Sequence, residues 1–430
     1  MKYKSVDVIE VMYKGHSVGA LALDPSSDYY AFEYNPDFIN TGIELAPLTL
    51  PLTRQTPVIF PYLPQATYYR LPAFVADSLP DAFGNALIDV WMARNGILKN
   101  QISILDRLAY IGERGMGALE FKPMIKIGDQ NPSALEMNRL VSTARKAVQI
   151  DLNEEDKSDA NDAAIKQLIS VGTSAGGARA KAVIGYNPKN NEFISGQFDL
   201  PEGFEHWLIK FDIPEQERFA GRREYGKIEY AYYLMAKECG IQMSECRLLQ
   251  IDDSFHFMTK RFDREADEKI HMQTLCAMAE LDYNQKQTHD YVQFFQTAQQ
   301  MELGYDTIDQ IFTRMAFNVI MGNNDDHTKN HAFLLKENSW KLSPAYDLTF
   351  AMNSDSEWLS RHLMGVNGKF IDITRDDMVS LGRKFFVRNP DEILNRVIEI
   401  SKKWDEFALE ANLSDSEINR IKIAISGLIV

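Results

Sequence analysis

Residues 325–347 read DDHTKNHAFLLKENSWKLSPAYD, and no other part of the sequence constrains the structure so closely. Upstream, apolar residues at helical spacing predict a buried helix that ends at Gly322: Ile308, Ile311, Phe312, Met315, Ala316, Val319 and Ile320. The loop 325–330 is too polar for a core and too compact for a linker. Residues 331–336 and 340–342 predict a hairpin that delivers the chain to Asp347.

This stretch holds the groups that phosphoryl transfer from ATP requires. Asp325 and Asn330 lie five positions apart in one loop, and Asp347 follows the hairpin. Protein kinases use an Asp to orient the substrate hydroxyl, then an Asn and a second Asp after a hairpin to hold Mg²⁺. The alternative is an Asn- and Asp-rich turn without catalytic function.

The bulk composition is that of a globular protein with more than one structural unit. The chain has 430 residues, of which 45% are hydrophobic and 25% charged, so two or three units are expected. A net charge of −15 argues against broad nonspecific binding to nucleic acid. The three cysteines form no CxxC pair and predict free thiols. With no run long enough to cross a membrane and no signal-peptide pattern at the start, we expect a cytoplasmic protein.

The N-terminal half is predicted to be rich in strands. Residues 1 to about 60 include a hairpin turning at 14–16 and a strand over Tyr29–Tyr34. Helices follow, one of them over 102–111, and nothing before about 125 has a catalytic constellation. We interpret this part as a packing or partner-binding module. The acidic residues 148–164 are the best candidate for a linker or a solvated helix.

A glycine-rich stretch, VGTSAGGARAK over residues 171–181, precedes an apolar strand. Small residues let backbone N–H groups approach phosphate oxygens, and Lys181 adds a positive charge. It is not a Walker loop, because Ala178 follows Gly177 where that motif has Lys. An ordinary glycine-rich turn between strands is the alternative.

Lys210 lies in a second predicted strand, HWLIKF at 206–211. A buried Lys needs an anionic partner, either ATP phosphates or Glu229 of the helix predicted over 224–240, unless it lies on an exposed face. Two short strands then lead into residues 260–264, KRFDR, which could form a hinge whose backbone meets adenine.

Helices dominate the C-terminal part. They are predicted over residues 288–300, 306–321, 390–404 and 414–428. A β-rich half followed by an α-rich half predicts an α+β fold with two lobes and a cleft between them.

With these motifs in place, the chain resembles the HipA family of serine/threonine kinases, the toxins of bacterial toxin–antitoxin pairs. The resemblance rests on SVGALAL, NPDF, LPLT, LPD at 79–81, the glycine-rich loop, WLIKF, KRFDR, GNNDDHTKNHAF and SPAYDL. It implies a kinase-like, two-lobed fold in three parts: an N-terminal subdomain at 1–125, a β-rich N-lobe at 126–262 and a helical C-lobe at 263–430.

The resemblance also implies the roles of individual residues. Asp325 would be the catalytic aspartate, and Asn330 and Asp347 would hold Mg²⁺. Ser174 would be the autophosphorylated residue, with Thr173 as the other candidate, and a phosphate of about −2 charge there would expel the loop and silence the kinase. The ATP site would comprise Gly176, Gly177, Ala178, Arg179, Ala180, Lys181, Lys210, Lys260, Arg261, Phe262, His327, Thr328, Lys329, Asn330, Tyr346 and Asp347.

Family members phosphorylate aminoacyl-tRNA synthetases and are neutralised by a small DNA-binding antitoxin, HipB, through which they join operator DNA. Similar partners are implied for this chain. It departs from better-known members at Arg179 and Ala180, where they have Gln-Glu, and at Asp326, where they have Gly. These differences leave substrate choice and loop behaviour open.

Two other functions fit parts of the sequence. A metal-dependent hydrolase could use Asp325, Asp326, His327 and His331, since the two histidines are four positions apart. However, the segment passes from loop into strand, and no Glu lies between the histidines as a general base. A catalytically silent co-repressor with the same fold is the second alternative.

Overall fold

The computed structural model describes residues 5–125 except 28 and 81, residues 180–428 except 213–223 and 267, and residues 135, 137, 138, 140 and 141. Contacts divide the chain into two units. Unit 1 comprises residues 1–45, 50–222 and 249–272, and unit 2 comprises residues 46–49, 223–248 and 273–430. The predicted linker at 148–164 lies outside the described residues.

The first sheet of unit 1 has five antiparallel strands in the order β4-β3-β2-β1-β5. β1 and β2 form the predicted hairpin, with Tyr13 opposite His16. The strands are β1 (Val8–Tyr13), β2 (His16–Asp24), β3 (Tyr29–Tyr34), β4 (Val58–Ile59) and β5 (Leu119–Lys122). The helices of this region are α1 (Pro36–Ile39), α2 (Gln65–Tyr68), α3 (Ala73–Ala76), α4 (Ala82–Arg94), the 3₁₀ helix η1 (Lys99–Gln101) and α5 (Ile104–Ile111).

Helix α5 begins two residues after the predicted start, because Ser103 caps it. The Ser103 hydroxyl accepts the Asp106 N–H at 3.1 Å, and the Asp106 carboxylate accepts the Ser103 N–H at 2.8 Å. This reciprocal pair satisfies two N–H groups that a helix start leaves without partners.

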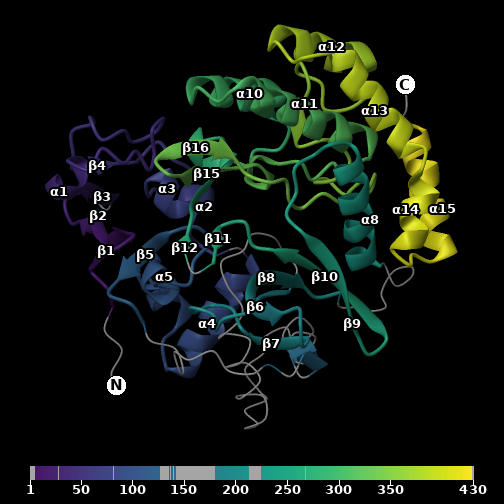
Figure 1. The fold of residues 1–430 in the computed structure, drawn as a ribbon. Helices are drawn as coiled ribbons and strands as arrows, with labels where there is room; N and C mark the ends of the chain where they lie inside the picture. The colour runs from purple at the N-terminus through teal and green to yellow at the C-terminus, as the bar shows by residue number, and fades with distance from the viewer. Residues whose placement is uncertain are drawn as a thin grey trace. The chain divides into compact units, whose positions relative to one another are not determined.

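The second sheet of unit 1 has the strand order β7-β6-β8-β10-β9. Its strands are β6 (Lys181–Asn187), β7 (Glu192–Ser195), β8 (Glu205–Lys210), β9 (Cys246–Ile251) and β10 (Ser254–Lys260). Trp207 and Ile184 of this sheet share a buried cluster with Ile88 of α4, which lies against the sheet (Figure 1). A small hairpin, β11 (Arg264–Glu265) and β12 (Glu268–Lys269), follows β10.

Unit 2 is mainly helical, with two small sheets (Figure 1). Its helices are α8 (Tyr225–Glu238), α9 (Leu275–Met278), α10 (Tyr291–Gln300), α11 (Tyr305–Ile320), the 3₁₀ helix η2 (Thr328–Asn330), α12 (Arg375–Lys384), α13 (Pro390–Ser401), α14 (Trp404–Glu410) and α15 (Asp415–Ser426). Its strands are β13 (His271–Thr274, which begins in unit 1), β14 (His289–Asp290), β15 (Ala332–Lys336), β16 (Ser339–Leu342) and β17 (Met364–Gly365).

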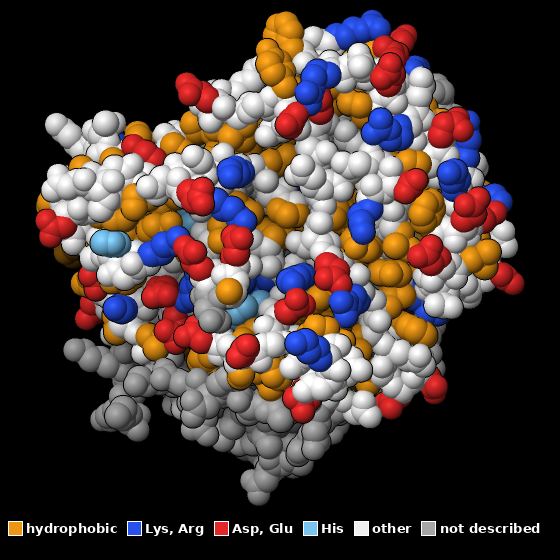
Figure 2. Space-filling model, in the orientation of Figure 1, with side chains coloured by type: hydrophobic (Ala, Val, Ile, Leu, Met, Phe, Trp, Pro, Cys, Tyr) orange, Lys and Arg blue, Asp and Glu red, His pale blue; other side chains and the backbone are white. Residues whose placement is uncertain are grey.

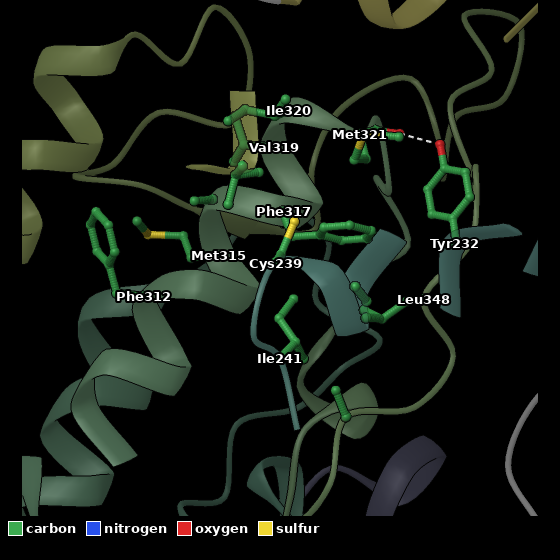
Figure 3. Close-up of a cluster of buried hydrophobic side chains, with 14 of the residues drawn as sticks. Tyr232, Cys239, Ile241, Phe312, Met315, Phe317, Val319, Ile320, Met321 and Leu348 are labelled. Atoms are coloured by element: carbon green, nitrogen blue, oxygen red, sulfur yellow. Dashed lines mark hydrogen bonds between the residues drawn. The ribbon is translucent and has the colours of Figure 1, made fainter. Parts of the chain in front are cut away.

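Helix α11 is the predicted buried helix, and all seven of its predicted core residues are buried. Figure 3 shows its side chains packed with others of unit 2, including Leu348. The Tyr232 hydroxyl donates to the Met321 carbonyl at 2.5 Å. Gly322, where the helix was predicted to end, adopts a left-handed conformation with φ of 63° and turns the chain toward the polar loop.

The helix predicted over 390–404 is wrong in its C-terminal part. The chain forms two helices, α13 and α14, and Lys402 and Lys403 lie between them. Trp404 is buried at this break, and its indole N–H donates to the Ile418 carbonyl of α15 at 3.0 Å. The break coincides with this buried tryptophan, so tertiary packing accompanies a helix boundary that local propensity did not indicate.

Strands dominate unit 1 and helices dominate unit 2, as the sequence predicts for an α+β fold. On the face seen in Figure 2, basic and acidic side chains are interspersed, and no broad basic area stands out among the described residues. Among those residues, no helix combines the length and apolar character needed to cross a membrane.

Candidate active site

The polar loop after α11 is closed by its own amide side chain. The Asn330 N–H donates to the His327 carbonyl at 2.8 Å, which forms the single turn of η2. The Asn330 side-chain Nδ2 donates to the Asp325 carbonyl at 2.7 Å. The five-residue spacing in the sequence is therefore the span of one closed loop, with Asp325 and Asn330 at its two ends.

The hairpin β15–β16 brings Asp347 to this loop. Phe333 pairs with Leu342 in the hairpin, and the chain then reaches Tyr346, whose hydroxyl donates to the Lys329 carbonyl at 2.6 Å. Asp347 itself has a φ of 57°, in the left-handed region that Asp tolerates better than most residues. Its charge contributes to the raised pKa of Asp325, so the two carboxylates are electrostatic neighbours.

The carboxylate of Asp325 is partly enclosed, with 38% of the side chain exposed. Its Oδ1 accepts the Trp358 indole N–H at 2.8 Å and lies 3.8 Å from His327 Nε2. The pKa of Asp325 is raised, chiefly because the carboxyl group is buried. The nearby His327 and the hydrogen bond from Trp358 lower this pKa, whereas the charges of Asp347 and Asp326 raise it. A carboxylate with a raised pKa is a better proton acceptor than an ordinary Asp.

Asp326 is fully buried beside the candidate catalytic residue. Its Oδ2 accepts the Tyr291 hydroxyl at 3.0 Å and lies 3.1 Å from His362 Nδ1. Its Oδ1 accepts the backbone N–H groups of Leu363 at 2.9 Å and Met364 at 3.2 Å. Asp326 therefore acts as a structural anchor for the loop.

Two aromatic rings lie near the His327 side chain. The centre of the Tyr283 ring lies 5.4 Å from that of the His327 ring. The centre of the Trp358 ring lies 6.4 Å from that of the His327 ring, in an edge-to-face arrangement. Lys329 places its ammonium 4.8 Å from the centre of the Tyr283 ring. His327 and Lys329, both predicted to line the ATP site, thus lie in one cluster with Asp325.

The structure does not support the ligand set of the hydrolase alternative. His331 is buried, with its ring 4.6 Å from that of Phe294, and burial lowers its pKa to about 3. Asp326 already accepts hydrogen bonds on both oxygens. Within the part of the chain that is described, no three His, Cys, Asp or Glu side chains are arranged to hold a metal ion.

Thr328 is also buried, and its hydroxyl donates to the Leu281 carbonyl at 2.7 Å. This side chain fixes η2 against the segment after α9. The predicted place of Thr328 in the ATP site stays a prediction.

In unit 1, the two predicted phosphate-binding lysines are directly opposite each other. Lys181 on β6 pairs with Lys210 on β8, so both side chains lie on one face of the sheet. Lys181 is buried, and the ammonium of Lys210 lies 5.8 Å from the centre of the Phe257 ring. The Ala180 carbonyl accepts the Phe211 N–H at 2.9 Å and so extends the same pairing.

The predicted hinge residues follow β10 in unit 1. Lys260 forms an ion pair with Glu205 at 2.6 Å. Arg261 is buried, donates its backbone N–H to the His206 carbonyl and pairs its guanidinium with Asp263. Phe262 lies at the turn that follows, partly exposed. The chain returns to unit 2 at residue 273, beyond this segment.

Several predicted site residues lie outside the described residues: Thr173, Ser174, Gly176, Gly177, Ala178 and Arg179. Of the glycine-rich loop, only Ala180 and Lys181 at its end are described. The roles of the others remain predictions.

The residues that hold the loop but lie far from it in the sequence were not predicted. Trp358 and His362 come 33 and 36 positions after their partners Asp325 and Asp326, and Tyr291 comes 35 positions before Asp326. The one available signal was a lone tryptophan in the polar stretch NSDSEWLS at 353–360. No spacing rule links such positions.

A cavity of about 450 Å³ in unit 2 contains none of the predicted site residues. It is lined by the ends of three helices, with Gly240 of the segment after α8, Gln310 of α11 and Arg396 of α13 among its walls.

Comparisons with known proteins agree with the family resemblance found in the sequence. The HipA N-terminal domain matches residues 9–122, and the HipA-like C-terminal domain matches residues 173–411, more than half of the chain. A Haemophilus influenzae protein named "Putative kinase" is 26% identical over 248 residues, which are 50% of this chain and 70% of that protein.

Among solved structures, the chain is similar to HipA of Shewanella oneidensis MR-1, solved in a complex with HipB and operator DNA. The TM-score is 0.68 at 17% identity, and the match covers 98% of this chain and 96% of the other. At this identity the likeness concerns the fold, and it confirms the predicted fold class.

Proposed function

Because this chain belongs to the HipA family, we propose that it is a kinase that transfers the γ-phosphate of ATP to a serine or threonine hydroxyl of a protein. The observation that carries the proposal is the closed loop in which Asn330 binds the Asp325 carbonyl while Tyr346 ties the Asp347 segment to Lys329. The name of the Haemophilus influenzae relative agrees with this activity.

Asp325 is proposed as the catalytic residue. Its carboxylate would accept or orient the proton of the substrate hydroxyl as the oxygen attacks phosphorus. Burial raises the pKa of Asp325 above that of an ordinary Asp, whereas the His327 imidazole and the Trp358 N–H limit this increase in pKa. A carboxylate whose pKa is raised fits this task.

Asn330 and Asp347 are proposed to hold Mg²⁺. The donor set fits, because the ion prefers carboxylate and amide oxygens, and the Asn330 Nδ2 is already committed to the Asp325 carbonyl, which leaves its Oδ1 as the ligand atom. When bound, Mg²⁺ neutralises charge on the transferring phosphate. The Tyr346 hydroxyl bond to Lys329 would fix the approach of Asp347 to the loop.

Other residues are proposed to bind ATP. Lys181 and Lys210, on one face of their sheet, would contact phosphate oxygens together with the glycine-rich residues 176–180. His327, Thr328 and Lys329 would line the nucleotide beside Asp325. Residues 260–262 would contact adenine through the backbone.

The partners are proposed from the family. Autophosphorylation of Ser174, or of Thr173, would silence the kinase by adding negative charge to a phosphate-binding loop. A small HipB-like antitoxin would neutralise the chain and link it to operator DNA, since the similar Shewanella oneidensis HipA was solved with HipB and its operator. An aminoacyl-tRNA synthetase is the proposed protein substrate.

The decisive experiment compares wild type with Asp325→Asn. After incubation with Mg·ATP, wild type is expected to gain the mass of one phosphate on a peptide from 165–185, because the kinase is proposed to phosphorylate its own glycine-rich loop. Asp325→Asn is expected to lose at least 100-fold in the rate of labelling, since it removes the proton acceptor. Asp376→Asn, an exposed carboxylate elsewhere in the same unit, is the matched control and should label normally.

Undiminished labelling of Asp325→Asn would reject the assignment of the catalytic residue. If a folded wild type bound Mg·ATP but transferred no phosphate to itself or to translation proteins, the silent co-repressor would be favoured.

A further inference from the structure

The segment 353–363 forms hydrogen bonds with three consecutive residues at the start of the candidate catalytic loop, Asn324, Asp325 and Asp326. Asn324 Nδ2 donates to the Leu359 carbonyl at 2.8 Å, and Asp325 Oδ1 accepts the Trp358 indole N–H at 2.8 Å. Asp326 then accepts the N–H of Leu363 at 2.9 Å. The contact of Trp358 is thus one of a series and is not an isolated surface contact.

Trp358 is held in place by its own loop. The Ser356 hydroxyl accepts the backbone N–H groups of Trp358 at 3.2 Å and Leu359 at 3.1 Å, so it closes a local turn. The Asn353 N–H donates to the Leu359 carbonyl at 3.2 Å and closes the wider loop. The ammonium of Lys286 lies 5.8 Å from the centre of the indole ring.

The indole N–H reaches one oxygen of Asp325 and not the other. Within the described part of the chain, Oδ2 makes no hydrogen bond, whereas Oδ1 binds Trp358 and faces His327 Nε2 at 3.8 Å. The terminal torsion of an Asp side chain is broad in energy, so a free carboxylate would rotate. A hydrogen bond to Oδ1 fixes that torsion and hence the direction of Oδ2.

We infer that Trp358 is a positioning residue that holds Oδ1 of Asp325 so that Oδ2 faces the substrate hydroxyl. This inference rests on the proposed kinase function and adds to it a residue from a separate loop. The His327 ring is a neighbour of the indole, with its centre 6.4 Å from that of Trp358 in an edge-to-face arrangement.

Trp358→Phe tests the inference, because it keeps an aromatic ring and removes the N–H donor, together with part of the ring, a loss that the control below shares. We expect kcat for phosphate transfer to fall about tenfold, as for one lost hydrogen bond to a charged group, with the KM for ATP within about twofold of wild type. Trp404→Phe is the matched control: it removes an indole hydrogen bond of 3.0 Å elsewhere in unit 2. It should lower Tm and leave kcat of the folded protein unchanged.

A second measurement does not require activity. The Trp358 indole N–H resonance, assigned by its loss in Trp358→Phe, should move upfield in Asp325→Ala because the carboxylate acceptor is gone. Asp325→Asn, which keeps the size of the side chain, should move it in the same direction. An unmoved resonance, or a normal kcat in Trp358→Phe, would overturn the inference. Wild type without any transfer would instead reject the proposed function, while the resonance still reports whether the bond exists.

Discussion

Asp263 is a buried carboxylate whose charge is balanced by two arginines of unit 1. Its oxygens accept bonds from Arg261 at 2.7 and 2.9 Å, from Arg264 at 2.8 Å and from the Gly117 N–H at 2.7 Å. Burial alone would raise the pKa of Asp263, but the two guanidinium groups and the amide outweigh it, and the pKa is lowered. One side chain therefore links the end of β10 to the loop before β5.

We predict that Asp263→Asn lowers the free energy of unfolding of unit 1 by about 3 kcal/mol at pH 7, since two buried arginines lose their counter-charge. Urea unfolding measures this loss. Asp199→Asn, which changes an exposed carboxylate of the same unit, serves as the control and should change the free energy of unfolding by less than about 0.5 kcal/mol. Equal midpoints for the two variants would show that Asp263 is not a structural charge.

At the level of elements, the polar loop after α11 is fixed by contacts with other segments more than by its own turn chemistry. Asp326 joins it to α10 through the Tyr291 hydroxyl and to the start of β17 through the Met364 N–H. Asn318 of α11 donates to the same tyrosine hydroxyl at 2.9 Å. The network is fully buried, so the loss of one acceptor leaves a donor without a partner.

We predict that Asp326→Asn lowers the free energy of unfolding of unit 2 by about 2 kcal/mol, because an amide cannot accept bonds on both of its terminal atoms. Calorimetry should show a lower Tm for Asp326→Asn and an unchanged Tm for Asp355→Asn. Hydrogen exchange should speed up in residues 362–364, which lose their acceptor. A wild-type exchange rate there would contradict the anchoring role.

At the scale of the whole molecule, each unit has its own buried cluster and its own buried histidines. Burial lowers the pKa of His206 and of His271 in unit 1 to about 4, and that of His331 in unit 2 to about 3. All three are neutral in the folded chain at pH 7. The ordinary pKa of a histidine is 6.5, so below that pH these side chains bind protons in the unfolded chain and stay unprotonated in the folded chain.

We predict that stability is lost as pH falls from 6.5 toward 4, and that these histidines contribute no pH dependence above about 7.5. In that acid window the unfolded state binds more protons, so the free energy of unfolding decreases with decreasing pH. Urea midpoints at pH 7.5 and 5 measure the effect. In His271→Gln, which cannot be protonated, the difference between the two pH values should shrink, and an unchanged difference would refute the contribution of His271.

Local pattern was sufficient for most elements. The period of the apolar residues predicted α11 and its buried face, the hairpin β1–β2 and the strand β3. It failed at residues 402–404, where one helix ends and another begins at the buried Trp404. Periodicity reports which residues are apolar, but it does not report where a helix must bend to bury them.

The sequence by itself determined the chain's α+β class, its family resemblance and the spacing of Asp325, Asn330 and Asp347, because these depend on residues close together along the chain. Only the tertiary structure decided that Lys181 faces Lys210 across two strands, and that Trp358 and His362 hold the aspartates of a loop more than thirty residues earlier. Such contacts join residues whose separation in sequence carries no period, and only the packing of the chain brings their side chains together.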